Sequence, residues 1–209
     1  RVVIRLSVLI FGSVGVLLVT AMILVVMPYV QFMAVEPEEG LAPYTVEQAR
    51  GRDVYVSLGC VYCHTQQPTD RVFAPDSERG WGRPSTPGDY VYDYPHQLGT
   101  MRTGPDLFNI GARQPSAGWH YAHLYNPRAV VPGSLMPAFP FLFEVKRELG
   151  PDDVKVDLPP EFAPKEGVVV AKPDAVALIA YLVGLDHTYP SQYLKYTSEQ
   201  ANLNNGAAQ

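Results

Sequence analysis

The sequence predicts a mainly α-helical protein, in which a single N-terminal transmembrane helix precedes a domain of short helices joined by long, proline-rich loops. The stretch from Leu6 to Val35 contains no charged residue. The 209-residue chain also contains 20 prolines, whose fixed φ angles stiffen loops. Only three later segments show the residue spacing of helices, so the regular core is small. We therefore expect a further group to hold the domain together.

The N-terminal apolar segment has the length of a membrane anchor. Its core from Leu6 to Met27 can cross a bilayer as a helix at about 1.5 Å per residue. Arg1 and Arg5 precede it and three glutamates follow it, so the positive-inside rule places the N-terminus in the cytoplasm. A cleaved signal peptide usually has an apolar core of only about 7–15 residues. We therefore expect a retained anchor.

Composition divides the chain into four parts. These are a transmembrane anchor at residues 1–35, an acidic linker at 36–44, a domain at 45–196 and a polar C-terminal tail at 197–209. The net charge is −5, and no run of basic residues occurs. Because nucleic-acid-binding domains carry basic patches, we expect no nucleic-acid partner.

The domain contains one predicted helix near its start and two near its end. Thr45 and Gln48 have the spacing of a capping box, which predicts a helix that continues to His64. Residues 117–125 predict a short helix, and residues 173–187 predict an amphipathic one. The predicted apolar face of this last helix contains Val176, Ile179, Leu182 and Val183.

Two long stretches lack helical spacing. Residues 65–118 are rich in Gly, Pro, Asp and Ser, but they contain aromatic residues throughout. That composition indicates an ordered loop rather than disorder. Residues 137–167 form a second proline-rich region with a charged middle, EVKRELGPDDVK.

The stretch GCVYCHTQQP, residues 59–68, contains both cysteines of the chain. On a helix, Cys60, Cys63 and His64 would project from one face. The pattern C-x-x-C-H is typical of c-type haem attachment. A structural zinc site would need further ligands, usually a second cysteine pair, and a thioredoxin-like dithiol would need a βαβ pattern. The sequence therefore predicts a covalently bound haem c with His64 below the iron.

The sixth iron ligand separates electron carriers from ligand-binding haems. Met136 lies in VVPGSLMPAFP, where flanking prolines favour a stiff, extended loop. Methionine is the usual partner of histidine in electron-transfer cytochromes, so we expect Met136 to fill this position. Met101 is an alternative, and His120 or His123 would give an iron with two histidine ligands.

Other residues are candidates for supporting the haem. The turn RTGPDL, residues 102–107, offers a carbonyl that can hold the second ring nitrogen of His64. Arg102, Arg113 and Arg128 are candidate partners for the haem propionates, because guanidinium groups pair with carboxylates through forked hydrogen bonds.

The order of these motifs carries a family resemblance. C-x-x-C-H, a Gly-Pro-Asp turn and a Met-Pro loop together resemble class I cytochrome c. The segments GRDVYVSLGCVYCHTQ, YVYDYPHQLGTMRTGPDLFNIGAR and WHYAHLYNPRAVVPGSLMPAFPFL resemble more closely the membrane-anchored monohaem cytochrome c subunit of cbb-type, or C-family, haem–copper oxidases. The resemblance covers residues 50–143, the anchor and the helix around LIAYLVGLD.

The resemblance implies one covalently bound haem c, attached at Cys60 and Cys63. It implies that His64 and Met136 are axial ligands and that the carbonyl of Pro105 accepts the ring N–H of His64. The subunit would not be catalytic alone. It would relay electrons from a c-type donor or subunit to a polytopic catalytic subunit with haem b and copper. It implies an anchor in the lipid of a bacterial plasma membrane, with the haem domain on the periplasmic side.

Two segments depart from the pattern expected for that family. They are QPTDRVFAPDSERGWGRPSTPGDY and the charged insert at residues 144–167. Both leave the identity of the complex open, since anchored cytochromes also serve nitric oxide reductases and other respiratory complexes. A haem enzyme or gas sensor with an open sixth site is the second class of function, and the sixth ligand distinguishes the two classes.

Overall fold

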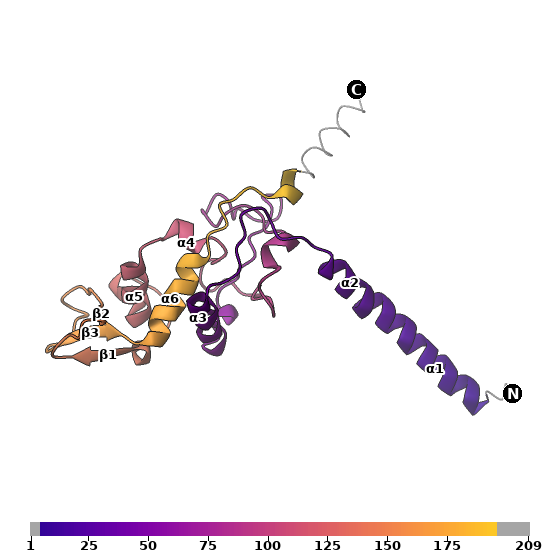
Figure 1. Cartoon of the computed structure of the whole chain (residues 1–209), viewed down its shortest axis with the longest axis horizontal. Helices are drawn as coiled ribbons and strands as arrows, with labels where there is room; N and C mark the ends of the chain where they lie inside the picture. Colours follow the sequence, from indigo (N-terminus) through magenta and orange to yellow (C-terminus); the bar gives the residue numbers. More distant parts are fainter. Residues whose placement is uncertain (1–4, 196–209) are drawn as a thin grey trace, which may run out of the picture. The chain divides into compact units, whose positions relative to one another are not determined.

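A computed structural model describes residues 5–195 and is shown in Figure 1. The chain forms two compact units, with the boundary between Pro37 and Glu38. Residues 38–44, which the sequence suggests as part of a separate linker, therefore belong to the second unit. The tail predicted at residues 197–209 and Arg1 lie outside the described residues.

The first unit is one long apolar helix. It comprises α1 (Leu6–Ala21), a π-helical turn (Met22–Val26) and α2 (Met27–Met33). The helix is 28 residues long, and its apolar side chains are not buried within the structure. At about 1.5 Å per residue it spans about 42 Å. The π-helical turn lies just before Pro28, whose ring would clash with the carbonyl of Leu24 in a regular helix. The single apolar helix predicted from the sequence is confirmed.

The second unit is built on a close crossing of α3 (Val46–Ser57) and α6 (Pro173–Gly184). Figure 1 shows these two helices side by side. Gly51 makes the approach possible, because a Cβ atom there would lie 1.8 Å from the carbonyl oxygen of Ala177. The buried residues of α6 are Ala175, Ala177, Leu178, Ile179, Tyr181 and Leu182. Ile179 and Leu182 are buried as predicted, whereas Val176 and Val183 are only half-buried, so the buried face of α6 differs in part from the predicted one.

Tyr181 lies at the centre of this core. Its ring contacts Tyr44 and Tyr55, with ring centroids 5.6 and 5.4 Å away. Its hydroxyl accepts a hydrogen bond of 3.0 Å from Nε2 of Gln66. The tyrosine thus links both helices to the segment that follows the C-x-x-C-H motif.

The beginning of α3 confirms the predicted capping box. Thr45 Oγ1 accepts from the backbone N–H of Gln48, and Gln48 Oε1 accepts from the backbone N–H of Thr45. The predicted continuation to His64 is wrong. Gly59 has φ +70°, a left-handed conformation that breaks the helix, and Cys60–Tyr62 form a short 3-10 turn instead.

Short helices frame the remainder of the domain. The structure contains α4 (Ile110–Arg113) and α5 (Ala117–Tyr125), the second of which confirms the predicted bounds. The 3-10 turns Pro87–Tyr90, Pro127–Ala129 and Pro140–Leu142 all have proline in their first turn. Prolines thus start short helical turns within the long loops.

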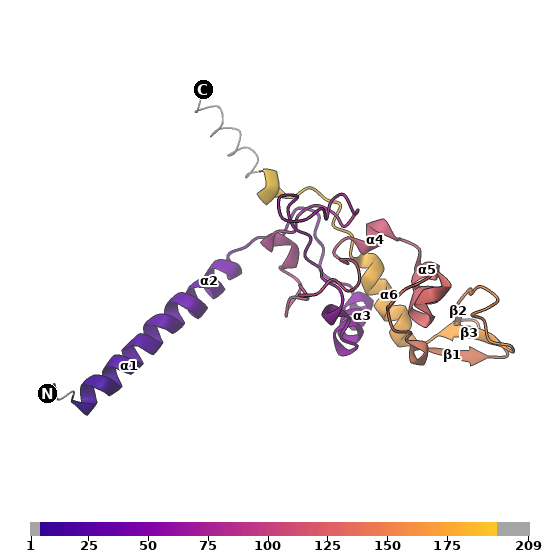
Figure 2. The ribbon, with the colours of Figure 1, turned by 180° about the vertical axis from the view of Figure 1, so that it is seen from behind.

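A three-stranded antiparallel sheet adds to the mainly helical fold and was not predicted. It comprises β1 (Phe143–Lys146), β2 (Val154–Lys155) and β3 (Val168–Ala171) in the order β1-β3-β2. Phe143 is paired with Ala171 in the register of β1 and β3. Figure 2 shows the sheet beside the start of α6. The best sequence signal for strands here is the β-branched run of β3. The charged segment between β1 and β2 makes a sheet in this region hard to recognise from the sequence.

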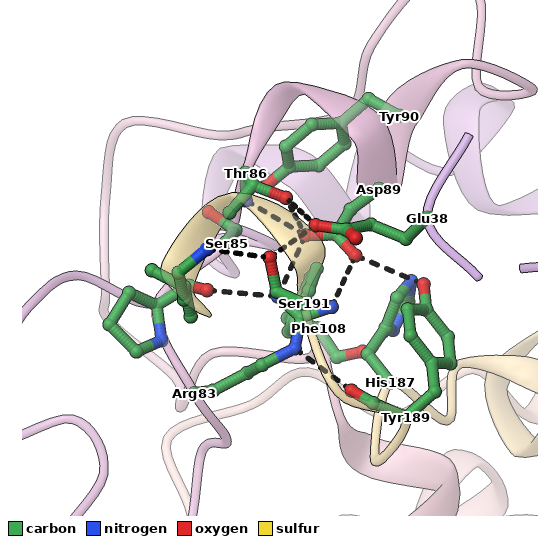
Figure 3. A network of polar contacts seen from close by, with 12 residues as sticks. Glu38, Arg83, Ser85, Thr86, Asp89, Tyr90, Phe108, His187, Tyr189 and Ser191 are labelled. Carbon is green, nitrogen blue, oxygen red and sulfur yellow. Dashed lines mark hydrogen bonds and ion pairs between the residues drawn. The ribbon is translucent and has the colours of Figure 1, made fainter. Parts of the chain in front are cut away.

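An ion pair fixes the long loop between α3 and α4, as Figure 3 shows. Arg83 donates two hydrogen bonds to Asp89, at 3.0 and 2.6 Å, and one to the carbonyl of Tyr189 at 3.1 Å. The hydroxyl of Tyr189 also donates to Asp89. Burial acts to raise the pKa of Asp89, but hydrogen bonds from Arg83 and Thr86 outweigh it, so the pKa lies below its ordinary value.

Replacement of Gly51 should destabilise the domain. In Gly51→Ala the new methyl group overlaps the backbone of α6, and we expect a loss of about 2 kcal/mol in the free energy of unfolding. Calorimetry of the purified protein would show a Tm lower by about 4–8 °C. Gly118→Ala in α5 is the matched control, because its nearest neighbour would lie 3.9 Å away. Equal Tm values for the two variants would contradict the close crossing.

Replacement of Asp89 should have a pH-dependent cost. Because the folded pKa lies below the ordinary 3.8, the stabilisation by this carboxylate is complete above that pH and is lost as the pH falls. We expect Asp89→Asn to cost about 3 kcal/mol at pH 7, since it leaves a half-buried guanidinium without its charge partner. Chemical denaturation should show this difference shrinking below about pH 4.

The matched control for Asp89 is Glu78→Gln, which removes the exposed ion pair of Arg71 with Glu78. An exposed pair contributes at most about 1 kcal/mol. A cost for Asp89→Asn that matches this control, or that does not change with pH, would show that the buried pair does not hold the loop.

Candidate cofactor site

The second unit contains a cavity of about 550 Å³, a size typical of cofactor sites. Its walls come from the C-x-x-C-H segment, the Gly-Pro-Asp turn, α4, α5, α6 and the loop at residues 131–137. The lining is mostly apolar, with a few polar groups directed inward. Motifs that lie more than 70 residues apart in the sequence thus meet around one space.

His64 is held at the wall of this cavity by the backbone of the Gly-Pro-Asp turn. Its Nδ1 lies 2.7 Å from the carbonyl oxygen of Pro105. A carbonyl can only accept, so Nδ1 carries the proton and Nε2 keeps its lone pair. Burial lowers the pKa of His64, although the hydrogen bond to Pro105 opposes this shift. The ring is therefore a neutral imidazole, the form that binds metals.

Gly104 allows this arrangement, since a Cβ atom there would lie 2.2 Å from Cε1 of His64. The Gly104 N–H donates to the carbonyl of Cys63 at 2.9 Å. The turn therefore contacts the motif through two backbone groups, the Gly104 N–H and the Pro105 carbonyl. The sequence signal for Gly104 is the G-P pair, which on its own predicts only a turn.

The side chain of Asp106 holds the Gly-Pro-Asp turn in place. Asp106 was not predicted as a site residue from the sequence. It is fully buried and accepts hydrogen bonds from the Thr65 hydroxyl and from the backbone N–H groups of Gln67 and Phe108. Burial raises the pKa of Asp106, against the effect of these donors. The side chain ties the segment after His64 to the turn that holds it.

The two cysteines differ in environment. Cys63 lines the cavity, whereas Cys60 is half-buried against the hydrophobic core and is not among the lining residues. No disulfide joins them. Burial raises the pKa of the Cys60 thiol to about 11, which disfavours the thiolate that a metal would need. A neutral thioether suits this environment better.

Met136 lines the cavity and is half-buried. Met101, the alternative methionine, is 57% exposed and does not line it. His120 and His123 do line it. Nε2 of His120 donates to the carbonyl of Gln114 at 2.8 Å. The structure therefore brings Met136 and both histidines to the same space as His64, and separates Met101 from it.

His123 has an unusual environment. Its ring stacks on Trp119, with centroids 4.6 Å apart and planes inclined by 10°. Its Nδ1 is buried and has no hydrogen-bond partner among the described residues. Burial, together with the neighbouring His120 and His64, lowers the pKa of His123 to about 4. The ring is neutral at pH 7, and its Nδ1 needs a partner that residues 5–195 do not supply.

Of the three predicted arginines, only Arg113 lines the cavity. Its Nη2 donates to the carbonyl of Asp106 at 3.0 Å, while its Nη1 is buried without a partner among the described residues. Arg102 instead donates to both carboxylate oxygens of Asp76, at 3.0 and 2.8 Å. Arg128 is exposed and outside the lining.

The sequence did not single out Arg79 and Trp81, which also line the cavity. The guanidinium carbons of Arg79 and Arg102 lie 4.9 and 5.1 Å from the Trp81 ring centroid. Their segment departs from the expected family pattern, and no local motif marks either residue. Only the fold brings them to the site.

These groups fit an iron porphyrin. The cavity has a neutral imidazole with one nitrogen available, a thioether from Met136, and a buried guanidinium nitrogen of Arg113 that has no partner within the described part of the chain. Iron in haem takes the first two as ligands, and a carboxylate satisfies the third. The close approach at Gly104 leaves the imidazole little freedom.

Comparison with known families agrees with this chemistry. The family described as "Cytochrome C oxidase, mono-heme subunit/FixO" matches residues 2–158, well over half of the chain. No curated protein matches the chain closely enough to serve as a relative. The matched region includes the apolar helix and every segment that lines the cavity except α6.

Replacement of Gly104 should displace His64. In Gly104→Ala the new methyl group overlaps the imidazole, and loss of such a supporting contact weakens metal ligation by about tenfold or more. On the proposal made below that His64 binds the haem iron, the optical spectrum of the purified protein should then show a larger fraction of haem without a histidine ligand. Gly150→Ala is the control, since its nearest neighbour would be at 3.4 Å. Identical spectra for the two variants would contradict the assigned role of the turn.

Proposed function

The chain belongs to the family of mono-haem subunits of cbb3-type cytochrome c oxidase, and on this premise we propose that Cys60 and Cys63 bind one haem c covalently. The family makes the protein an electron-transfer subunit of the oxidase. We propose His64 and Met136 as the axial iron ligands. When bound, the haem supplies one-electron exchange between ferric and ferrous iron.

The contact between His64 and Pro105 is the observation that carries this proposal. Nδ1 of His64 donates to the carbonyl of Pro105 at 2.7 Å, which directs the other nitrogen to a metal. Such support fixes ring orientation and raises the basicity of the ligand. The neutral thioether of Met136 favours ferrous iron and so raises the reduction potential. Two strong-field ligands would keep small molecules off the iron.

Arg113 has the role of neutralising a haem propionate. A buried guanidinium nitrogen without a partner is costly. Arg113 lines the cavity, and its Nη1 has no partner among residues 5–195. A carboxylate there would complete its hydrogen bonds. Arg102 has a different role, because Asp76 already occupies its guanidinium. It packs on Trp81 and stiffens the cavity wall.

His123 is the second candidate for the sixth ligand, because its buried Nδ1 has no partner among the described residues. The ring of His123 is stacked on Trp119. This contact restricts how the ring could turn towards an iron atom. Met136 is half-buried in the cavity lining, and the hydrogen bond that holds its loop uses its backbone N–H, which donates to the Ser134 hydroxyl at 3.3 Å. We therefore favour Met136 and assign His123 to a hydrogen bond with the haem.

The electron-transfer partners of this subunit would belong to the oxidase complex. We propose that the subunit passes electrons from a c-type donor, or from a second c-type subunit, to a polytopic subunit that contains haem b and copper. The apolar helix anchors it in the lipid of a bacterial plasma membrane, with the N-terminus in the cytoplasm by the positive-inside rule. Because the matched family is an oxidase family, this proposal is favoured over a nitric oxide reductase or an open-site haem sensor.

Replacement of Met136 tests the sixth ligand. Met136→Ala should lose the long-wavelength sulfur-to-iron band of ferric haem and should lower the reduction potential, because the thioether is removed. Its ferrous form should then bind carbon monoxide. Optical redox titration of the purified complex measures the first two, and the spectrum of the reduced complex with and without carbon monoxide measures the third. Met101→Ala, at an exposed position outside the cavity, is the control.

The same titration on His123→Ala separates the two candidate ligands. If His123→Ala abolishes six-coordination while Met136→Ala keeps the spectrum and potential of the wild type, iron has two histidine ligands and the assignment of Met136 is wrong. If the wild-type ferrous haem binds carbon monoxide readily, the sixth site is open and the electron-carrier proposal fails.

A further inference from the structure

Glu38 is a buried carboxylate at the point where the second unit begins. It is 2% exposed, whereas Glu36 and Glu39 on either side of it are exposed. A carboxylate is costly to bury unless hydrogen bonds compensate it. Its burial in an otherwise exposed acidic stretch therefore requires specific partners.

Those partners come from two distant segments, as Figure 3 shows. The Thr86 hydroxyl donates to Oε1 of Glu38 at 2.6 Å, and the Ser191 hydroxyl donates to the same oxygen. The backbone N–H of Gln192 donates to Oε2 at 2.8 Å. The backbone N–H of Glu38 itself donates to the carbonyl of Gly88 at 3.2 Å. Glu38 thus binds both the loop after α3 and the segment after α6.

This network continues towards the cofactor cavity. Thr86 contacts Asp89, which is paired with Arg83. The guanidinium carbon of Arg83 lies 5.8 Å from the ring centroid of Phe108, and the ring of His187 stacks on the same phenylalanine at 3.9 Å. The backbone N–H of Phe108 donates to Asp106, which positions the turn that holds His64. The carboxylate of Glu38 is therefore connected to the cavity wall through buried contacts.

We propose that Glu38 is a positioning residue that clamps the membrane tether to the haem domain. This inference rests on the proposed function. Helix α2 ends at Met33 and α3 begins after its cap at Thr45. With the clamp, at most residues 34–37 act as a link between the apolar helix and the domain. Without it, the link would extend over residues 34–44.

A shorter link keeps the haem domain closer to its partner in the membrane. For a flexible chain, effective concentration falls roughly as the −3/2 power of length. Lengthening the link from residues 34–37 to residues 34–44 would lower it by about fivefold. The clamp would thereby sustain electron delivery without touching the cofactor.

Insertions on the two sides of Glu38 test the position of the clamp in the full oxidase complex. A Gly-Ser-Gly-Ser insert between Val35 and Glu36 lengthens the link ahead of the clamp, and should slow electron transfer from this subunit to the next haem by about threefold. The same insert between Ala42 and Pro43, both exposed, lies behind the clamp and should leave the rate unchanged. Equal slowing by both inserts would overturn the proposal.

A second measurement does not depend on electron transfer. Glu38→Gln should speed hydrogen exchange at Leu41, whose N–H donates to the carbonyl of Glu38, and at Gln192. Glu39→Gln is the matched control, with an exposed side chain. The haem spectrum and reduction potential should stay unchanged in both variants. Equal exchange in the two variants would overturn the clamp.

The two readouts separate the clamp from the function on which it rests. Altered exchange in Glu38→Gln together with a wild-type haem that lacks a sixth ligand would retain the clamp as a structural contact but overturn its role in electron delivery. Normal ligation with unchanged exchange and equal effects of both inserts would overturn the clamp and leave the proposed function intact.

Discussion

The close approach of the Gly104–Pro105 backbone to the ring of His64 is the constraint on which the site depends. The turn has room for the imidazole only because residue 104 lacks a side chain, and the Pro105 carbonyl fixes the tautomer. Asp106 then joins the turn to the segment that follows the histidine. The imidazole is thus held by the backbone of the turn at Nδ1, and the same ring lines the cavity.

The remaining architecture keeps this contact in place. The crossing of α3 and α6 at Gly51 sets where the C-x-x-C-H segment leaves the core. Tyr181 of α6 binds Gln66, two residues after His64. On the other side, the network around Glu38 and Asp89 ties the start and end of the domain to Phe108. Within the second unit, these contacts connect the packing of the core, the orientation of His64 and the first residues of the unit.

Local patterns were sufficient to predict the apolar helix, the capped start of α3, and the bounds of α5. They failed where long-range packing decides the outcome. The helix from Thr45 stops at Ser57, because Gly59 takes a left-handed conformation. The strands of the sheet were not predicted, because charged residues interrupt the apolar pattern of this region. Those charges are paired within the region, as Lys146 is with Asp153. At the site, the motifs predicted His64 and Met136 as iron ligands, and both line the cavity. Only the fold shows that Arg113 lines the same cavity while Arg102 is paired with Asp76.

A cryo-electron microscopy map of the purified oxidase complex would test the central claim most directly. We expect a porphyrin in the cavity, thioether bonds to both Cys60 and Cys63, and His64 and the sulfur of Met136 as the two protein ligands of the iron. We also expect a propionate beside Nη1 of Arg113. Density for the porphyrin outside this cavity, or a ring nitrogen of His123 at the iron, would contradict the central claim.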